Sequence, residues 1–254
     1  MAEYILEACV DSVESALAAA RGGATRLELC ANLIIGGTTP SPALFEAVRE
    51  AVDLPVNVLI RPRFGDFLYT DAEYAVMCRE IRDFAARGAN AVVVGALCPD
   101  GTLDREKMEG MIRAAGDARI TLHRAFDVCR DPARTLEEAV FLGVDTILTS
   151  GQQASAWAGR ACIGELLERA DDQADILIGG GVSAQTIRDF RRSFPKAGAF
   201  HLSGKVVLDS GMTFRNQSVS MGLPGISEFQ IWRTDEKAIR QAAEALKEGR
   251  SGNA

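Results

Sequence analysis

The sequence predicts an α/β protein with a single domain, a (β/α)8 barrel (TIM barrel) that carries an irregular C-terminal extension and a final helix. Eight short apolar runs alternate with amphipathic helical patterns, which is typical of parallel β/α units. The length of 254 residues fits the roughly 250 that such a barrel needs. Glycines at helix ends, at positions 22, 88 and 143, supply regular C-caps before the next strand.

The individual elements follow from the local pattern of apolar and β-branched residues. Strands are predicted at residues 4–9, 26–30, 56–61, 91–95, 119–123, 146–149, 176–179 and 199–203. Helices are predicted at residues 13–20, 41–52, 72–87, 105–115, 132–142, 161–170 and 184–194. Eight units favour a closed barrel over an open doubly wound sheet, and the first turn, residues 8–12, lacks the glycine-rich phosphate motif of a Rossmann fold.

The pattern changes after the eighth strand. We expect the barrel to occupy residues 1–204, with residues 205–254 forming an extension and a helix that packs on the barrel. Residues 206–229 show no clear periodicity, so we expect an irregular segment that covers part of the barrel or joins a subunit interface. Thr234 and Asp235 offer an N-cap for a helix that runs to about Glu248, and residues 251–254 should fray.

Composition limits the functional classes. A net charge of -7 argues against nucleic acid as a partner. No run approaches the roughly 20 apolar residues of a membrane span, and residues 1–4 carry no secretory leader, so we expect a soluble, cytoplasmic protein without a membrane partner. The six cysteines are dispersed, with no C-x-x-C pair, which favours reduced thiols over disulfides or structural zinc.

Ionisable residues gather at the carboxyl ends of the predicted strands, where a parallel barrel carries its active face. The chain has only two histidines, and each stands at the polar end of an apolar run. Residues two apart on a strand share a side, so these groups should meet at the barrel mouth. A buried structural ion network is the alternative. The candidate catalytic residues are Glu7, Glu28, Arg61, His123 and His201.

A second set of residues could bind a small anionic substrate. Arg61 and Arg63 can each hold a carboxylate or phosphate bidentately, and the glycine loop at residues 179–181 permits close backbone approach to an anion. A tight turn would select the same glycines. Residues 36–41 could likewise form a substrate loop, or a plain loop that ends in the Ser41 N-cap. The candidate substrate-binding residues are Arg63, Arg124, Ser150, Gly179, Gly180, Gly181 and Ser203.

The same strand ends could bind a metal ion in two ways. A set made of Glu7, Glu28, His123 and His201 would suit zinc or manganese. Cys9 and Cys30 lie at the ends of two adjacent predicted strands, each two residues after a glutamate, and thiolates suit copper(I). Neither set has a diagnostic spacing, and inert buried thiols are the alternative for the two cysteines.

Several motifs together resemble the CutC family of copper homeostasis proteins. They extend from the first strand to the final helix and read E-L-C-A-N-L at 28–33, G-G-T-T-P-S at 36–41, I-R-P-R at 60–63, G-D-F-L-Y at 65–69, H-R-A-F-D at 123–127, L-T-S-G at 148–151, G-G-G at 179–181, F-H-x-S-G at 200–204, S-M-G at 220–222 and W-R-T-D at 232–235. One departure is Gln152, where the family pattern continues with a second glycine.

The resemblance implies a cytoplasmic (β/α)8 barrel that self-associates into a homo-oligomer such as a homodimer. It also implies a role in copper tolerance or trafficking, with copper as the bound cofactor and Cys9 and Cys30 as its thiolate ligands. The strand-end residues themselves support a different hypothesis, an enzyme such as a hydrolase, isomerase or lyase that acts on a small sugar-like or anionic metabolite. In that case His123 and His201 act as acid and base.

Overall fold

Eight parallel strands close into a barrel in the computed structural model, which describes residues 4–216, 218–219, 221–222 and 225–248. Each strand pairs with its sequence neighbours, and the last pairs with the first, which confirms the predicted fold class. The barrel strands are β1 (Ile5–Val10), β2 (Arg26–Leu29), β3 (Val56–Leu59), β4 (Ala91–Val94), β5 (Arg119–Leu122), β6 (Thr146–Thr149), β7 (Asp175–Ile178) and β8 (Ala199–Leu202).

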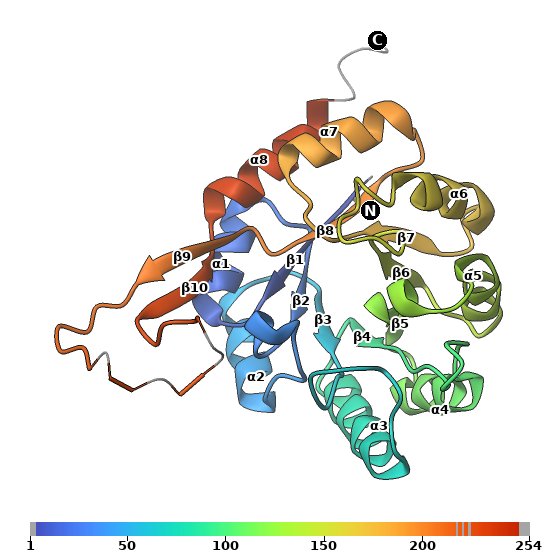
Figure 1. Ribbon diagram of the computed structural model, residues 1–254, viewed down its shortest axis with the longest axis horizontal. Helices are drawn as coiled ribbons and strands as arrows, with labels where there is room; N and C mark the ends of the chain where they lie inside the picture. Colours follow the sequence, from blue (N-terminus) through green and yellow to red (C-terminus); the bar gives the residue numbers. More distant parts are fainter. Residues whose placement is uncertain (1–3, 217, 220, 223–224, 249–254) are drawn as a thin grey trace.

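Helices surround the barrel on its outside (Figure 1). Those that follow the strands are α1 (Val13–Gly22), α2 (Pro42–Ala51), α3 (Asp71–Ala86), α4 (Arg105–Ala115), α5 (Pro132–Phe141), α6 (Arg160–Ala170) and α7 (Ala184–Ser193), and a final helix, α8, spans Glu236–Lys247. Two short 3-10 turns, η1 (Leu33–Ile35) and η2 (Arg124–Val128), lie in the loops after β2 and β5. Within the described ranges, no helix combines the length and the apolar character of a membrane span.

The two sides of each strand have different surroundings. The outward side chains, such as Leu6 and Ala8 of β1, join the large apolar core that the helices cover. The inward side chains form two small apolar clusters, one around Cys9 and Cys30 and the other around Leu148. Several other inward positions are polar, so the barrel interior holds buried charges as well as apolar side chains.

Helix ends follow the signals in the sequence. The Ser41 hydroxyl accepts a hydrogen bond from the Leu44 N–H, and Pro42 takes the first helical position of α2. Gly23, Gly88 and Gly143 all have positive φ, the conformation that ends a helix before the next strand. Several predicted strands extended one or two residues too far, because the chain leaves the barrel ladder as it turns into each loop.

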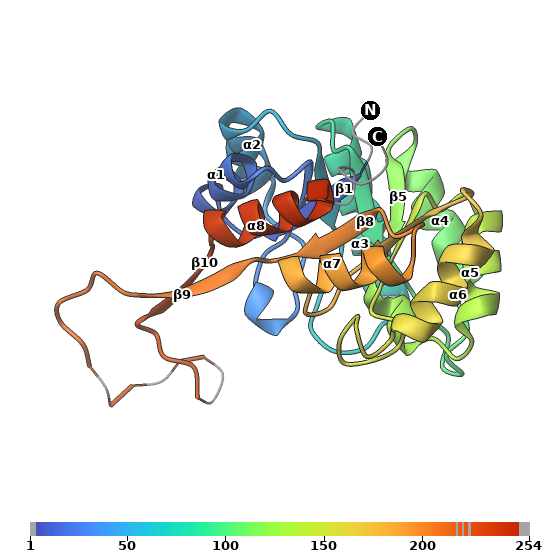
Figure 2. The same cartoon turned by 90° about the horizontal axis from the view of Figure 1, so that it is seen from above.

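The predicted irregular segment at 206–229 was partly wrong. Residues Lys205–Asp209 form β9, which pairs antiparallel with β10 (Gln230–Thr234) in a two-stranded ribbon. Figure 2 shows this ribbon projecting away from the barrel, so it does not fold over the mouth. Helix α8 returns to the barrel and contacts α1 and α7. The predicted fraying at 251–254 lies outside the described residues.

Candidate functional site

Glu7 lies at the centre of a buried polar network inside the barrel. It stands on β1 in register with Arg26 of β2 and His201 of β8. Its Oε2 accepts hydrogen bonds from Arg26 Nε at 2.5 Å and from Asn57 Nδ2 at 2.9 Å. Its Oε1 lies 2.8 Å from His201 Nδ1. Three strands, β2, β3 and β8, therefore direct polar side chains to the carboxylate of Glu7, which is 1% exposed.

Charge compensation makes this burial possible. Burial alone would raise the pKa of Glu7, but the Arg26 guanidinium and His201 outweigh it and lower that pKa to about 2. Burial alone would lower the pKa of His201, but Glu28, Cys9 and Glu7 together raise it well above its ordinary value. Glu7 is therefore a carboxylate and His201 an imidazolium, so the Nδ1–H of His201 donates to Glu7.

Two thiols lie next to this network at the carboxyl ends of β1 and β2. The Sγ atoms of Cys9 and Cys30 are 3.5 Å apart, and Cys30 Sγ is also 3.5 Å from Glu28 Oε2. The same Glu28 oxygen lies 3.6 Å from His201 Nε2. Cys9, Glu28 and Cys30 each offer a ligand atom within 4.8 Å of the others, and all three are buried. We call Cys9 and Cys30 the thiol pair.

The surroundings keep the thiol pair protonated while no ion is bound. The hydrogen bond with Cys30, burial and the carboxylate of Glu28 raise the pKa of Cys9 well above its ordinary value. Burial and Glu28 raise the pKa of Cys30 to about 12. Burial also raises the pKa of Glu28, although His201 opposes this effect. A metal ion can bind both sulfurs only by displacing protons, which a soft, thiol-seeking cation does effectively.

The set expected for zinc or manganese does not assemble completely. Glu7, Glu28 and His201 come within 4.8 Å of one another, but His123 is not part of this group. One oxygen of Glu7 is already occupied by Arg26 and Asn57. The donor set that remains accessible to an ion is therefore the thiol pair with Glu28, which is the softer of the two.

His123 and Arg61 form a second buried polar group at the mouth. His123 follows β5, and its Nδ1 accepts the Ala125 N–H at 3.1 Å, so its remaining proton is on Nε2. Burial, helped by Arg61, lowers the pKa of His123 to about 3. The Phe67 ring packs against His123 at a tilt of 45° and also lies under the Arg61 guanidinium. His123 Nε2 and Arg61 Nε are buried and have no hydrogen-bond partner among the described residues.

Arg61 itself is held mainly by backbone. Its Nη1 donates to the carbonyls of Gly36 and Gly37, and its Nη2 donates to the carbonyl of Gly65 at 2.8 Å. The start of the loop at residues 36–41 therefore binds Arg61, so the whole loop is not free to bind a ligand. Ser41 in the same loop caps α2, so the plain-loop interpretation accounts for most of that segment.

Arg63 does not point into the barrel with Arg61. Strand β3 ends at Leu59, so the alternation of sides no longer applies by residue 63. Arg63 Nε donates to Glu73 Oε1 at 2.5 Å, and its Nη2 donates to Asp66 and to the carbonyl of Leu68. Arg63 therefore stabilises the loop before α3 through these hydrogen bonds.

Arg124 and Ser150 come together through a residue that sequence reasoning did not select. Asp127 of η2 accepts hydrogen bonds from Arg124 Nε at 2.6 Å and from the Ser150 N–H and hydroxyl. Arg124 Nη2 also donates to the Ser150 hydroxyl. Gln152, the departure from the family pattern, has a φ of 59°, which a glycine would adopt more easily, and its N–H donates to Asp127.

The glycine loop after β7 is required by close packing. A Cβ at Gly179 would lie 2.6 Å from Leu148 Cδ1, and Gly180 and Gly181 have φ values of 96° and 70°. The tight-turn interpretation therefore accounts for these glycines without a ligand. Ser203, just past β8, lines a pocket beside Cys9.

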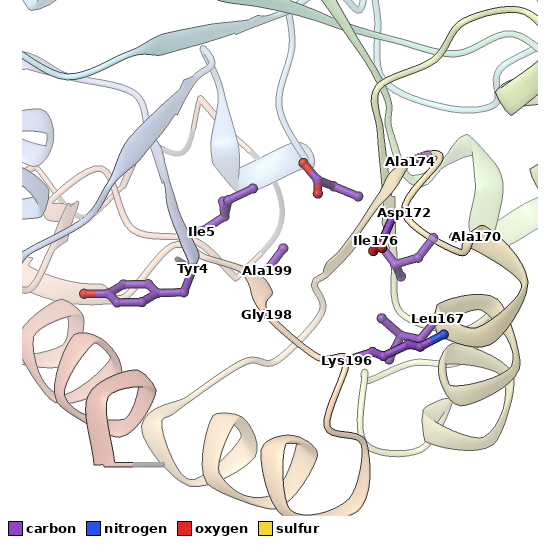
Figure 3. A pocket seen from close by; sticks show the side chains of 11 residues that line it. Tyr4, Ile5, Leu167, Ala170, Asp172, Ala174, Ile176, Lys196, Gly198 and Ala199 are labelled. Atoms are coloured by element: carbon purple, nitrogen blue, oxygen red, sulfur yellow. The ribbon is translucent and has the colours of Figure 1, made fainter. Parts of the chain in front are cut away.

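Another pocket, of about 370 Å³, lies at the amino ends of the strands. Figure 3 shows its lining, to which Tyr4, Ile5 and Ala199 contribute from the barrel and Lys196 from the chain before β8. None of its lining residues is a cysteine or a histidine. Because barrels of this class carry their sites at the opposite face, this pocket is not the candidate site.

Arg26 and Asn57 belong to the site although sequence reasoning passed over them. Each stands at an inward position of its strand, Arg26 two residues before Glu28 and Asn57 two residues before Leu59. The alternation that selected Glu28 and Cys30 would have selected Arg26 as well.

Comparison with known proteins agrees with the motifs. The model of the CutC family matches residues 4–205. The chain belongs to the CutC family. A Homo sapiens relative named copper homeostasis protein cutC homolog is 44% identical over 93% of this chain and 87% of its own length. A CutC family protein from Bacteroides fragilis is 41% identical over 97% of this chain and 98% of its own length.

Solved structures agree on the fold of this CutC chain. A crystal structure of a CutC protein from Streptococcus agalactiae superposes with a TM-score of 0.74 and 28% identity, covering 79% of this chain and 98% of that one. A structure titled native KDPGal superposes with a TM-score of 0.51 at 12% identity, covering 96% and 94% of the two chains. The second likeness concerns the barrel fold alone.

Proposed function

We propose that this CutC protein binds one copper(I) ion per chain through Cys9 and Cys30 and acts in copper homeostasis. The observation that carries the proposal is the buried thiol pair, with its sulfurs 3.5 Å apart and Glu28 beside them. Soft thiolates select copper(I). The copper homeostasis names of the relatives support the same ion.

The residues around the thiol pair have separate roles in this proposal. Cys9 and Cys30 bind the ion, and Glu28 receives a thiol proton or contributes an oxygen. The Glu7 and Arg26 pair fixes His201, whose imidazolium offsets the negative charge that two thiolates bring into the barrel. The free thiols require reducing conditions, which supports a cytoplasmic location.

Titration against a chromophoric copper(I) chelator under anaerobic conditions tests the proposal. The wild type should take up one copper(I) per chain, and Cys9→Ser or Cys30→Ser should lower the affinity at least about 100-fold, since each leaves a single thiolate. Cys98→Ser is the matched control, because that cysteine lies outside the site. An unchanged affinity for copper(I) in both Cys9→Ser and Cys30→Ser would contradict the proposal.

A second candidate function is catalysis on a small anionic metabolite at the mouth. It is favoured by His123 Nε2 and Arg61 Nε, two buried atoms without a partner among the described residues, since such donors often await a ligand. A thermal-shift screen of sugar phosphates and carboxylic acids tests this idea. A substrate should stabilise the wild type but not His123→Ala. A compound that stabilises both equally would not support a site at His123.

We also propose that the chain self-associates, and that the β9–β10 ribbon of one copy binds a second copy of the same chain. An isolated two-stranded ribbon is marginally stable in water, and Val206, Val207 and Leu208 of β9 are 38%, 46% and 46% exposed. Light scattering should show an oligomer for the wild type and a monomer for Leu208→Lys. An unchanged mass for the variant would place any interface elsewhere.

A further inference from the structure

A pocket of about 540 Å³ opens between the carboxyl ends of β1 and β2 and the base of the β9–β10 ribbon. Cys9 lines this pocket, so one sulfur of the thiol pair borders a solvent-connected space. Figure 1 shows the ribbon leaving the barrel beside α1. We call this space the ribbon pocket. Its lining residues are Cys9, Asp11, Ser15, Ala31, Asn32, Leu33, Ile34, Ser203, Lys205, Gln230, Ile231, Trp232, Arg233 and Thr234.

The ribbon pocket is positively charged within an acidic protein. Lys205 and Arg233 outnumber Asp11 among its lining residues, whereas the whole chain carries a net charge of -7. The Lys205 ammonium lies 4.0 Å from the centroid of the Trp232 ring. Arg233 Nη2 lies 3.8 Å from the exposed Glu14, its Nη1 donates to the Trp232 carbonyl at 3.3 Å, and its charge also acts on Asp11. Among the described residues neither cation has a carboxylate closer than 3.8 Å, so each can still bind an anionic ligand.

The same pocket offers apolar surface beside these cations. Trp232, Ile231 and Leu33 line it, and its volume suits a small molecule rather than a folded protein. Such a combination recognises a compact organic anion, whose carboxylates reach the cations while its stem packs on the tryptophan. Because Cys9 borders the space, a thiol on that ligand could approach the sulfur of the site.

We propose that the ribbon pocket binds copper(I) complexes of small thiols that carry carboxylates, and that the ion passes from the carrier thiolate to Cys9 and then to Cys30. This inference rests on the proposed function, because it names the form in which that ion arrives. Copper(I) is held by thiolates in a reducing medium, so exchange between sulfurs is the chemically expected route.

The transfer balances without any change of oxidation state. Bonds between copper and the carrier sulfurs break, and bonds from copper to Cys9 Sγ and Cys30 Sγ form. Each protein thiol loses its proton, and the departing carrier thiolates take up these protons as they become free thiols. Copper remains copper(I) throughout, and the carboxylates of the carrier stay with Lys205 and Arg233 until the carrier leaves.

Binding of a carrier analogue tests the pocket without copper. S-methylglutathione has two carboxylates but no free thiol, and it should quench Trp232 fluorescence in a Trp157→Phe background, because Trp157 lies outside the pocket. Lys205→Gln with Arg233→Gln should weaken this binding at least about 10-fold. Arg215→Gln is the matched control, since it pairs with Asp209 on the same ribbon but does not line the pocket. Equal affinity in all variants would overturn the proposal.

The transfer itself is followed by stopped-flow absorbance of the copper–thiolate bond. The double variant should accept copper(I) from its glutathione complex about 10-fold more slowly than the wild type, yet accept it from β-mercaptoethanol, a neutral thiol, at the same rate. Equal slowing with both carriers overturns the inference. If chelator competition shows no copper(I) binding at all, the proposed function fails, and the S-methylglutathione result still decides whether the pocket binds the carrier.

Discussion

Glu7 illustrates how a buried charge depends on its partners. The pKa of Glu7 is lowered from 4.5 to about 2, so its ionised form stabilises the fold fully above about pH 5, and this stability is lost as the pH falls toward 2. We predict that Glu7→Gln lowers the free energy of unfolding by about 3 kcal/mol at pH 7, with a smaller loss near pH 3. Urea denaturation at the two pH values measures both.

The control for this prediction is Glu109→Gln, because Glu109 is half-exposed and lies 3.8 Å from its partner Arg113. That change should alter the free energy of unfolding by less than about 0.5 kcal/mol at either pH. A loss for Glu7→Gln that is the same at pH 7 and pH 3 would mean that the carboxylate charge is not what stabilises the fold.

The protonated thiol pair leads us to predict that the affinity for copper(I) depends on pH. Because the pKa of Cys30 is raised to about 12 and that of Cys9 is also raised, both sulfurs carry protons near neutral pH. Copper(I) displaces these protons, so its apparent affinity should rise with pH. We expect about 100-fold per pH unit if both protons reach solvent, and about 10-fold if Glu28 keeps one. Chelator competition between pH 6 and pH 8 measures the slope, and a flat profile would exclude binding by both thiols.

At the scale of residues, the sequence predicts best those site residues that lie within regular strands. Alternation along β1 and β2 placed Glu7, Cys9, Glu28 and Cys30 on the inner side, where the structure has them. It failed for Arg63, which lies four residues beyond the end of β3 in a loop that has its own hydrogen bonds. Strand periodicity says nothing about a side chain once the ladder has ended.

At the scale of elements, the contact between α1 and α8 depends on a missing side chain. A Cβ at Gly22 would lie 2.6 Å from Ile239 Cβ and 2.8 Å from the Glu236 carbonyl. Gly22→Ala should therefore push α8 outward and lower the free energy of unfolding by about 1–3 kcal/mol, despite the better helix propensity of alanine. Chemical denaturation measures the change.

Gly198→Ala is the matched control for this contact, because a Cβ there would meet only the Lys196 carbonyl, at an ordinary 3.9 Å. We expect it to be close to neutral. If Gly22→Ala were equally neutral, α8 would have to shift at no energetic cost, which its buried Ile239 and Leu246 make difficult.

The β9–β10 ribbon was the element that sequence patterns missed. Local periodicity detects a strand that packs one side against a core, but all five residues of β9 are exposed, so no burial pattern marks it. Its partner β10 begins 21 residues after β9 ends, which places the pairing beyond the reach of a short window. Helix α8, in contrast, buries one side and was predicted from its N-cap onward.

At the scale of the whole molecule, the connection between the barrel and the C-terminal extension decides how the chain unfolds. Thr234 at the end of β10 donates its N–H to the Ser15 hydroxyl of α1, and the Asp235 N–H donates to the Gly204 carbonyl. Helix α8 then buries Ile239 and Leu246 against the barrel helices. We propose that the β9–β10 ribbon and α8 unfold together with the barrel.

The two tryptophans can test this cooperativity, since Trp157 lies before α6 on the barrel and Trp232 lies on β10. Trp157→Phe and Trp232→Phe each leave one fluorescent probe. In a single cooperative transition, the two probes and far-ultraviolet circular dichroism should give the same denaturation midpoint for each variant. A lower midpoint for Trp232 fluorescence than for circular dichroism in Trp157→Phe would mean that the ribbon detaches first. In that case the ribbon pocket would open before the barrel lost its structure, because Trp232, Lys205 and Arg233 all come from the ribbon while Cys9 stays on β1.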